Sequence, residues 1–416
     1  MTITKTLFDN FSQFVLYIKN LIVNLYLDTK TKVKTMEIKF RNSEVFPLLQ
    51  KVAKAVSPKP MIPILSNILL HIDSAGVLVM TGGDSEIWLS AQCQLFNEGS
   101  ESLDICVNTQ DLLKVLGNLG DCEVAFDIDT DSNRIKVKYP TGNMVIPMMK
   151  ADEYPKIKTD GDEYPTSFHI DAQRLISLVS GVGFCTGADE IRPVMQAVFM
   201  DFSKDDALSV CATDGHRLAM VKTEPVTFEG EAVQNLKLTQ KTVSNIPSLF
   251  GRHIGDVIVK CNEKSVCIES EGETVRLVSR QIEGNYPNYM AVIPSSSAIN
   301  VSINRKALEG ALKRVTALND VSGLTVLKLK YNALEISAQD IDYGRSVSES
   351  VACEYDGNDL TIGFKGELLM QFVSMLDGED IVLRMNDCAR PGVLVPSHQS
   401  EGFKILYLLM PMMLVD

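Results

Sequence analysis

The pattern of apolar and polar positions repeats three times along the chain. Residues 38–52, 168–182 and 301–315 each begin with two alternating apolar positions and then change to an apolar spacing of three or four. Alternation favours a strand and the wider spacing favours an amphipathic helix, so each copy predicts a strand that leads into a helix. The copies are offset by 130 and 133 residues, which is too long for a solenoid repeat. We therefore expect each copy to be a domain.

A second strand-to-helix signal follows in each copy, and short alternating runs lie between the two signals. The predicted helices are residues 43–56, 109–118, 171–181, 240–250, 304–317 and 366–376. The alternating runs include residues 67–72, 77–81, 86–92 and 134–139, and Asp214-Gly215 predicts a hairpin turn. Consecutive strands outnumber the helices, so the predicted fold class is α+β, with two helices per domain packed on antiparallel sheets. The predicted domains are residues 36–155, 160–293 and 298–416.

The charge pattern separates the helices from the rest of the chain. The chain has 416 residues and a formal net charge of −13, yet Lys and Arg recur on the polar faces of the predicted helices. For any one helix this pattern is typical of a solvated face. Its recurrence in an acidic chain favours a second interpretation, in which the helices share a basic surface that binds a polyanion.

Residues 1–35 lie outside the repeat. We expect Met36 to be the functional start, because the first copy begins directly after it. The segment 7–27 is partly apolar but too polar to span a bilayer, so an amphipathic helix on a membrane surface is the alternative.

The sequence offers little catalytic chemistry. It has no glycine-rich phosphate-binding motif, its histidines lack metal-ligand spacing, and its nine cysteines include no CxxC pair, which favours reduced thiols and no cofactor. Asp214 and His216 could form an acid/base pair in a hydrolase, but the equivalent positions in the other two copies lack the histidine. A turn or a binding loop is the better interpretation. The apolar end, residues 408–414, is either a last core strand or an exposed protein-binding surface.

Several motifs resemble one known family. Residues 212–218 (ATDGHRL), 284–289 (GNYPNY), 59–65 (KPMIPIL) and the terminal Met410-Pro411-Met412 are similar to the β subunit of bacterial DNA polymerase III, the sliding clamp. The resemblance covers the chain from Met36 to Leu414. It implies a non-catalytic protein in which two chains of three domains form a closed ring around duplex DNA, with helices lining the hole and without base readout.

The resemblance and the helix faces together suggest where DNA is bound. Lys59 matches a DNA-contact position of the family and Arg192 lies near another. The helix faces add Lys51, Lys54, Lys114, Arg174, Lys241, Lys306, Lys313 and Arg314.

The resemblance also implies one peptide pocket per chain, which accepts a short motif from the polymerase α subunit, the clamp loader, and other polymerases and repair proteins. Its wall is expected to contain Met195, Thr213, Gly215, His216, Arg217, Leu218, Pro287, Val292, Leu368, Leu408, Met410 and Met412. The sequence departs from the family pattern at Met195, which replaces a commoner leucine, and at Met413, which replaces a basic residue. Val415 and Asp416 extend the end.

The expected homodimer joins the first domain of one chain to the third domain of the other. Ala317 and Leu318 match a family interface position, and Met144 lies near the opposing surface. Edge strands on the two sides would pair across the joint. A cytoplasmic location and no membrane partner complete these expectations.

Overall fold

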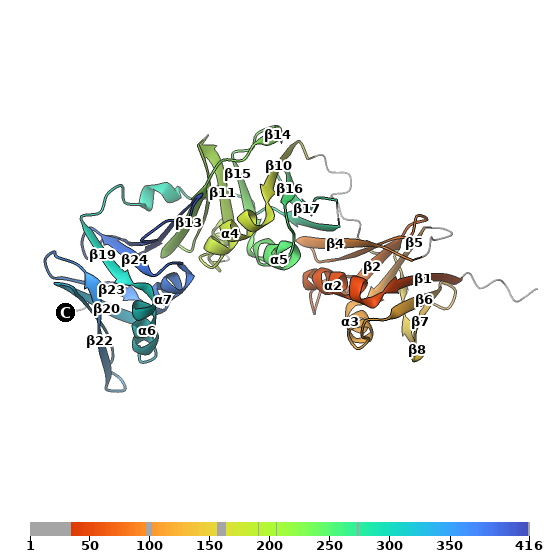
Figure 1. Ribbon diagram of the computed structural model, residues 1–416, viewed down its shortest axis with the longest axis horizontal. Helices are drawn as coiled ribbons and strands as arrows, with labels where there is room; N and C mark the ends of the chain where they lie inside the picture. Colours follow the sequence, from red (N-terminus) through yellow and green to blue (C-terminus); the bar gives the residue numbers. More distant parts are fainter. Residues whose placement is uncertain are drawn as a thin grey trace, which may run out of the picture. The chain divides into compact units, whose positions relative to one another are not determined.

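The computed structural model describes residues 35–96, 102–155, 164–189, 191–204, 206–272 and 274–414. These residues form two compact units (Figure 1). One unit extends to Asp84 and includes Ser90–Pro155, and the other contains Ser85–Leu89 and the chain beyond Pro155.

The first repeat forms two antiparallel sheets and a pair of helices. The sheets have the strand orders β1-β6-β7-β8 and β4-β3-β2-β5-β9, and α2 packs against α3. The elements are β1 (Thr35–Arg41), α2 (Asn42–Val52), β2 (Asn67–Ile72), β3 (Val77–Gly83), β4 (Ile87–Gln94), β5 (Leu103–Asn108), α3 (Thr109–Gly117), β6 (Glu123–Asp129), β7 (Arg134–Tyr139), β8 (Gly142–Pro147) and β9 (Met149–Lys150).

The central repeat has the same plan, with α4 packed against α5. Its sheets have the orders β14-β10-β16-β17-β18 and β15-β11-β12-β13. The elements are β10 (Thr166–Asp171), α4 (Ala172–Gly183), the short 3₁₀ helix η3 (Pro193–Gln196), β11 (Ala197–Lys204), β12 (Ala207–Thr213), β13 (Arg217–Thr223), β14 (Phe228–Gly230), β15 (Asn235–Thr239), α5 (Gln240–Phe250), β16 (Asp256–Cys261), β17 (Ser265–Ser270), β18 (Val275–Arg280) and η4 (Tyr289–Val292).

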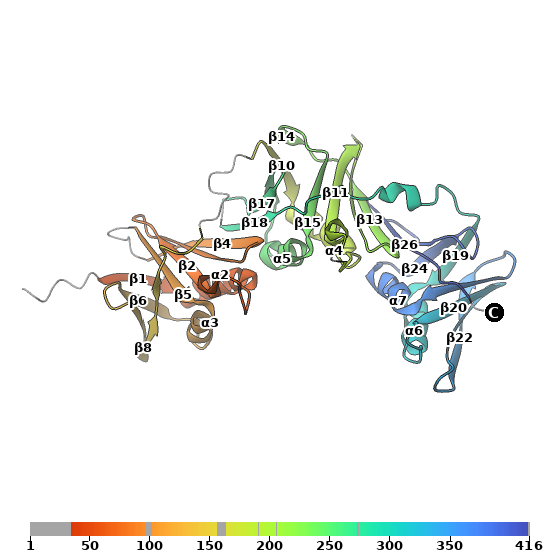
Figure 2. The same ribbon diagram turned by 180° about the vertical axis from the view of Figure 1, so that it is seen from behind.

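The last repeat continues the central one. Strand β26 pairs antiparallel with β13, from Arg217 opposite Leu409 to Thr223 opposite Phe403. The shared sheet then runs β26-β25-β24-β19-β22-β21-β20-β23, and α6 packs against α7 (Figure 2). The elements are β19 (Ile299–Asn304), α6 (Arg305–Thr316), β20 (Leu324–Lys330), β21 (Ala333–Asp340), β22 (Arg345–Glu354), β23 (Leu360–Lys365), α7 (Gly366–Met375), β24 (Asp380–Met385), β25 (Gly392–Pro396) and β26 (Phe403–Leu409).

The strand-to-helix junctions explain why the same unit recurs. At four junctions the last strand residue caps the helix with its side-chain oxygen, which accepts a backbone N–H of the first turn and satisfies an otherwise orphan donor. The caps are Asn108, Asp171, Thr239 and Asn304. The predicted apolar stripes, such as Leu308, Leu312 and Val315 on α6, are all buried. The prediction of two helices per repeat on antiparallel sheets is therefore confirmed.

The first helix is shorter than the prediction of residues 43–56. Helix α2 ends at Val52 and tightens into a 3₁₀ turn, Ala53–Ala55, and the backbone of Val56 is extended. A proline at position 58 restricts the backbone before it to extended conformations, so the helix cannot continue to this point.

Candidate functional site

The hairpin turn between β12 and β13 is held by its own side chains. The Asp214 carboxylate accepts the backbone N–H groups of His216 at 2.9 Å and Arg217 at 3.0 Å. The Thr213 hydroxyl donates to the Arg217 carbonyl at 2.6 Å and accepts the Gly215 N–H at 3.1 Å. Gly215 has a φ of +90°, which a residue with a side chain rarely adopts. The sequence Thr-Asp-Gly therefore fixes a rigid loop that presents the exposed His216.

Arg217 joins this loop to the last repeat. Its Nε lies 2.9 Å from Asp214 Oδ2, its Nη2 donates to the Phe184 carbonyl at 2.8 Å, and its Nη1 donates to Gln371 Oε1 on α7 at 2.5 Å. The guanidinium carbon also lies 5.8 Å from the centre of the Phe184 ring. Because the side chain is only 11% exposed and three protein acceptors hold it, Arg217 positions the loop.

The C-terminal segment lies beside the same loop. The Met410 N–H donates to the His216 carbonyl at 2.9 Å, and the Met412 N–H donates to the Gly363 carbonyl on β23 at 2.8 Å. Residues up to Leu409 form β26, and the strand ends just before Pro411, which cannot donate to a ladder. Met410 is 39% exposed and Met413 is 90% exposed. The segment is therefore a core strand up to Leu409 and an exposed apolar end after it, and protein binding by this end stays a prediction.

The remaining predicted pocket residues come from three further segments. Met195 on η3 is buried, and its Cε would lie 3.9 Å from a Cβ placed on Gly215. Leu218 and Leu408 belong to an apolar cluster with Tyr289. Pro287 and Val292 are exposed on the segment that includes η4, and Leu368 is half-buried on α7.

The segment that carries Pro287 and Val292 is anchored to the central sheet. The Tyr289 hydroxyl donates to Asp201 Oδ2 at 2.7 Å, and Tyr286 stacks on Phe199 with ring centres 4.4 Å apart. Burial raises the pKa of Asp201, but hydrogen bonds from Ser203 and Tyr289 outweigh it and leave that pKa below its usual value. The structure therefore brings Met195, the β12–β13 turn, β26 and this anchored segment together on one side of the second unit.

The Asp214–His216 pair of the hydrolase hypothesis does not form. Both oxygens of the Asp214 carboxylate are used by backbone N–H groups and by Arg217, so this carboxylate does not hold the exposed His216 imidazole.

Several of the predicted DNA-binding cations already have protein partners. Arg314 makes two 2.6 Å hydrogen bonds to Glu349 on β22, Lys313 lies 2.5 Å from Glu309, and Arg192 lies 2.9 Å from Asp189. Pairing with the cation lowers the pKa of each of the carboxyls Glu349, Glu309 and Asp189. To bind DNA, each of these cations would have to exchange its carboxylate partner for a phosphate.

The other predicted cations differ in exposure. Arg174 donates to the Thr223 hydroxyl at 3.1 Å and to the Glu224 carbonyl, and burial lowers the pKa of Lys241. Lys51 is half-buried on α2. The remaining four are exposed, and within the described ranges they have no ion pair: Lys54, Lys59, Lys114 and Lys306.

One of the predicted dimer residues lies on an edge strand, and the other two follow a helix. Met144 is half-buried on β8, the last strand of its sheet, and Ala317 and Leu318 directly follow α6. Across the described residues, β22 pairs with β21 along residues 345–352 and meets β19 only at Cys353 and Glu354. One edge of β22 is therefore left without a strand partner over most of its length.

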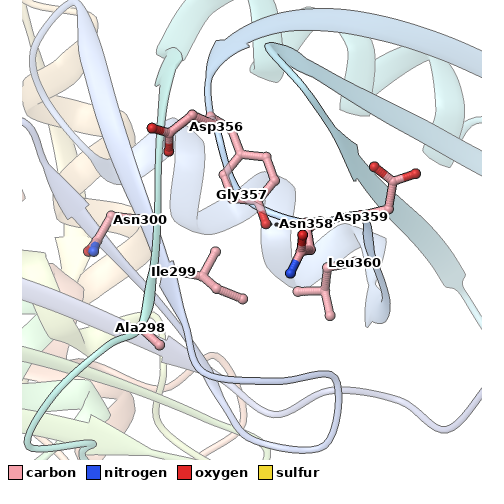
Figure 3. A pocket seen from close by; sticks show the side chains of 9 residues that line it. Ala298, Ile299, Asn300, Asp356, Gly357, Asn358, Asp359 and Leu360 are labelled. Atoms are coloured by element: carbon pink, nitrogen blue, oxygen red, sulfur yellow. Dashed lines mark hydrogen bonds between the residues drawn. The ribbon is translucent and has the colours of Figure 1, made fainter.

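A cavity of about 520 Å³ lies elsewhere in the last repeat (Figure 3). The cavity lies between the start of β19 and the β22–β23 loop. Figure 3 shows the side chains of Ile299 and Leu360 near its middle and the carboxylates of Asp356 and Asp359 on opposite sides. None of the predicted site residues line it.

Comparisons with known proteins agree with the order of the three repeats. Three family profiles match in order: the N-terminal domain of the DNA polymerase III beta subunit at residues 36–158, the central domain at 169–288 and the C-terminal domain at 290–413. A beta sliding clamp from Synechocystis is 29% identical over 404 residues, which cover 92% of this chain and 100% of the relative. One from Synechococcus elongatus is 28% identical over 396 residues, with 91% and 100% covered.

Solved structures show the same fold. The DNA polymerase III beta subunit from Thermotoga maritima has a TM-score of 0.82 at 24% identity, and the sliding clamp from Bartonella birtlesii has 0.83 at 22%. Each comparison covers 91% of this chain and 100% of the other. Three repeats of paired helices on antiparallel sheets, in this order, define the class of DNA clamps.

The chain belongs to the DNA polymerase III beta subunit family, the bacterial sliding clamps. It is a DNA sliding clamp for replication, a non-catalytic processivity factor that works with DNA and a polymerase. The hydrolase hypothesis is wrong. The membrane hypothesis rests on residues 7–27, which lie outside the described residues. Among the helices that the structure describes, none is long and apolar enough to cross a bilayer.

Proposed function

We propose that two copies of this chain join head to tail into a ring that encircles duplex DNA in the cytoplasm. The observation that carries the proposal is a pair of strand edges that have no partner strand among the described residues, β8 in the first repeat and most of β22 in the last. An exposed strand edge is a template for pairing with another chain, and pairing β8 of one protomer with β22 of the next closes both. Met144, Ala317 and Leu318 would lie at this joint.

Inside the ring, phosphates would be held without base readout. The exposed Lys54, Lys59, Lys114 and Lys306 are the first candidates, because binding there breaks no ion pair seen among the described residues. Arg192, Lys313 and Arg314 would contribute less, since a surface ion pair must first be exchanged.

The peptide cleft would receive the client proteins one at a time. The exposed Pro287, Val292 and Met410 would supply the apolar contacts beside the exposed His216, and the buried Met195, Leu218 and Leu408 would support them from below. The polymerase, the clamp loader and repair proteins would compete for this surface. The rigidity of the Thr213–Arg217 loop supports this role, because a wall that is already ordered loses little entropy when a peptide binds.

The joint between protomers is tested by native mass measurement and by a substitution that removes a backbone donor from the edge of β22. We expect the wild-type protein to have the mass of two 45.9 kDa chains. Ser348→Pro on β22 removes one backbone donor from that strand, so it should yield monomers that keep the wild-type circular dichroism spectrum. Thr361→Pro on β23, a strand outside the proposed joint, is the control and should remain dimeric. A monomeric wild-type protein would refute the ring.

A further inference from the structure

Two adjoining hollows form one groove at the end of the central sheet. They have volumes of about 400 Å³ and about 460 Å³, and both are lined by Lys204 and Ala207. Most residues that line the first hollow are apolar, among them Phe202, Leu208, Pro225, Val226, Phe228 and Val233. Most residues that line the second hollow are polar or charged, with Lys204, Lys222 and Lys404 beside Phe403, Asp206 and Glu224. None of the residues predicted to bind DNA or client peptides line either hollow.

The apolar hollow is preformed. The Phe202 and Phe228 rings meet each other at 5.2 Å and the buried Phe168 at 5.5 and 5.6 Å, all in edge-to-face geometry. This mutual packing holds the two half-buried rings in place and leaves the hollow as a fixed apolar socket. The cavity is large enough for one bulky apolar side chain.

The second hollow places two lysines opposite each other on neighbouring strands. Lys222 on β13 and Lys404 on β26 are directly opposite each other on neighbouring antiparallel strands. Like charges at directly opposite positions destabilise a strand pair. In the described part of the chain neither lysine has an ion pair, although the whole chain has a net charge of −13. An anionic group placed between the two ammonium groups would remove the repulsion.

We propose that this groove is a second protein-docking surface, and that its occupant is an acidic peptide segment with a bulky apolar residue. The carboxylates would lie between Lys222 and Lys404, and the apolar side chain would enter the socket formed by Phe202 and Phe228. A nucleic acid fits less well. The aromatic rings are engaged with one another rather than free to stack on bases. The surface lies outside the peptide cleft proposed above and does not depend on it.

The test is a selection of dodecapeptides from a random phage-displayed library on the full-length protein. The selected peptides are then synthesised and titrated against variants by fluorescence polarisation. We expect acidic peptides with a Phe or Leu, bound at least tenfold more weakly by Lys222→Glu/Lys404→Glu and by Ala232→Trp, which fills the apolar hollow. Lys264→Glu reverses an exposed lysine on the β16–β17 turn of the same domain and is the matched control, with binding unchanged.

Folding is checked in the same samples. Lys222→Glu alone places opposite charges at the cross-strand pair, so its unfolding midpoint should equal or exceed that of the wild type. Two results would overturn the proposal. One is that no selected peptide distinguishes the wild type from both groove variants. The other is that a twenty-nucleotide oligothymidylate shows the variant dependence and the acidic peptides do not.

Discussion

Removing the Arg217 guanidinium should loosen the joint between the central and last repeats. Arg217 contacts Asp214, the Phe184 carbonyl at the end of α4 and Gln371 on α7. A hydrogen bond to a charged group contributes about 1.5–3 kcal/mol, and leaving a largely buried partner unpaired adds to the loss. For this partly exposed site we expect Arg217→Ala to lower the free energy of unfolding by about 2–4 kcal/mol.

The chain contains a matched control for this change. Arg192 pairs with Asp189 at the same spacing of three residues and the same 2.9 Å distance, but its side chain is 60% exposed compared with 11% for Arg217. An exposed pair contributes about 0–1 kcal/mol, so Arg192→Ala should have little effect on stability. The comparison isolates burial and the additional contacts from the ion pair itself.

The assay is urea unfolding at one fixed protein concentration, because subunit association would otherwise change the apparent stability. Combining Arg217→Ala with Gln371→Ala in a double-mutant cycle should give a coupling energy of about 1 kcal/mol, which reports the contact between the two repeats. A loss of stability in Arg217→Ala no larger than that in Arg192→Ala, or a coupling to Gln371 of zero within error, would contradict the positioning role of Arg217.

Three other changes test separate parts of the account. Lys306→Ala should reduce the slope of log K against log salt for DNA association by about 0.9 for each phosphate that the protein no longer neutralises, and an unchanged slope removes Lys306 from the interface. Met410→Ala should weaken the binding of a client peptide by about 1–3 kcal/mol in calorimetry. Met413 lies after the strand and is 90% exposed, so Met413→Ala should leave peptide binding unchanged. Equal losses in the two variants would contradict the proposed cleft. The lowered pKa of Asp201 stabilises the fold above the ordinary carboxyl pKa of about 3.9, and this stabilisation is lost as the pH falls below that value through the folded pKa. The stability lost in Tyr289→Phe should therefore be constant near neutral pH and shrink as the pH is lowered below about 4. A pH-independent loss would contradict the Tyr289–Asp201 contact.

Local patterns predict the repeated units well, because each unit carries its own signals. The stripe of Leu308, Leu312 and Val315 and the cap at Asn304 both lie within a few residues of the helix they specify. The Asp214-Gly215 turn is similarly local, since the Asp214 carboxylate binds the next backbone groups.

Pairing between distant segments could not be predicted in this way. Strands β13 and β26 are both apolar and lie about 190 residues apart in the sequence. Neither apolar pattern indicates which other strand will pair with it. The contact of Arg217 with Gln371 and the opposition of Lys222 and Lys404 both follow from that pairing. These features therefore become visible only in the folded chain.

Among the candidate DNA-binding residues, one ion pair can be predicted from the sequence and another cannot. Glu309 and Lys313 are four residues apart on one helix, with the acid first, so their pairing is readable from the sequence. The pairing of Arg314 with Glu349 is not, because β22 reaches α6 only through the tertiary fold. The polar face of the helix alone therefore predicts an unpaired Arg314, whereas in the structure Arg314 is paired with the carboxylate of Glu349.

The most direct test of the ring is whether DNA topology determines retention. The purified protein is assembled on nicked circular duplex with a clamp loader, separated from free protein by gel filtration, and then divided into samples with and without a restriction enzyme that linearises the DNA. A ring that encloses DNA should remain on the circles at high salt and be lost from the linear form by sliding off its ends. Equal retention on both forms, or equal loss from both, would contradict encirclement.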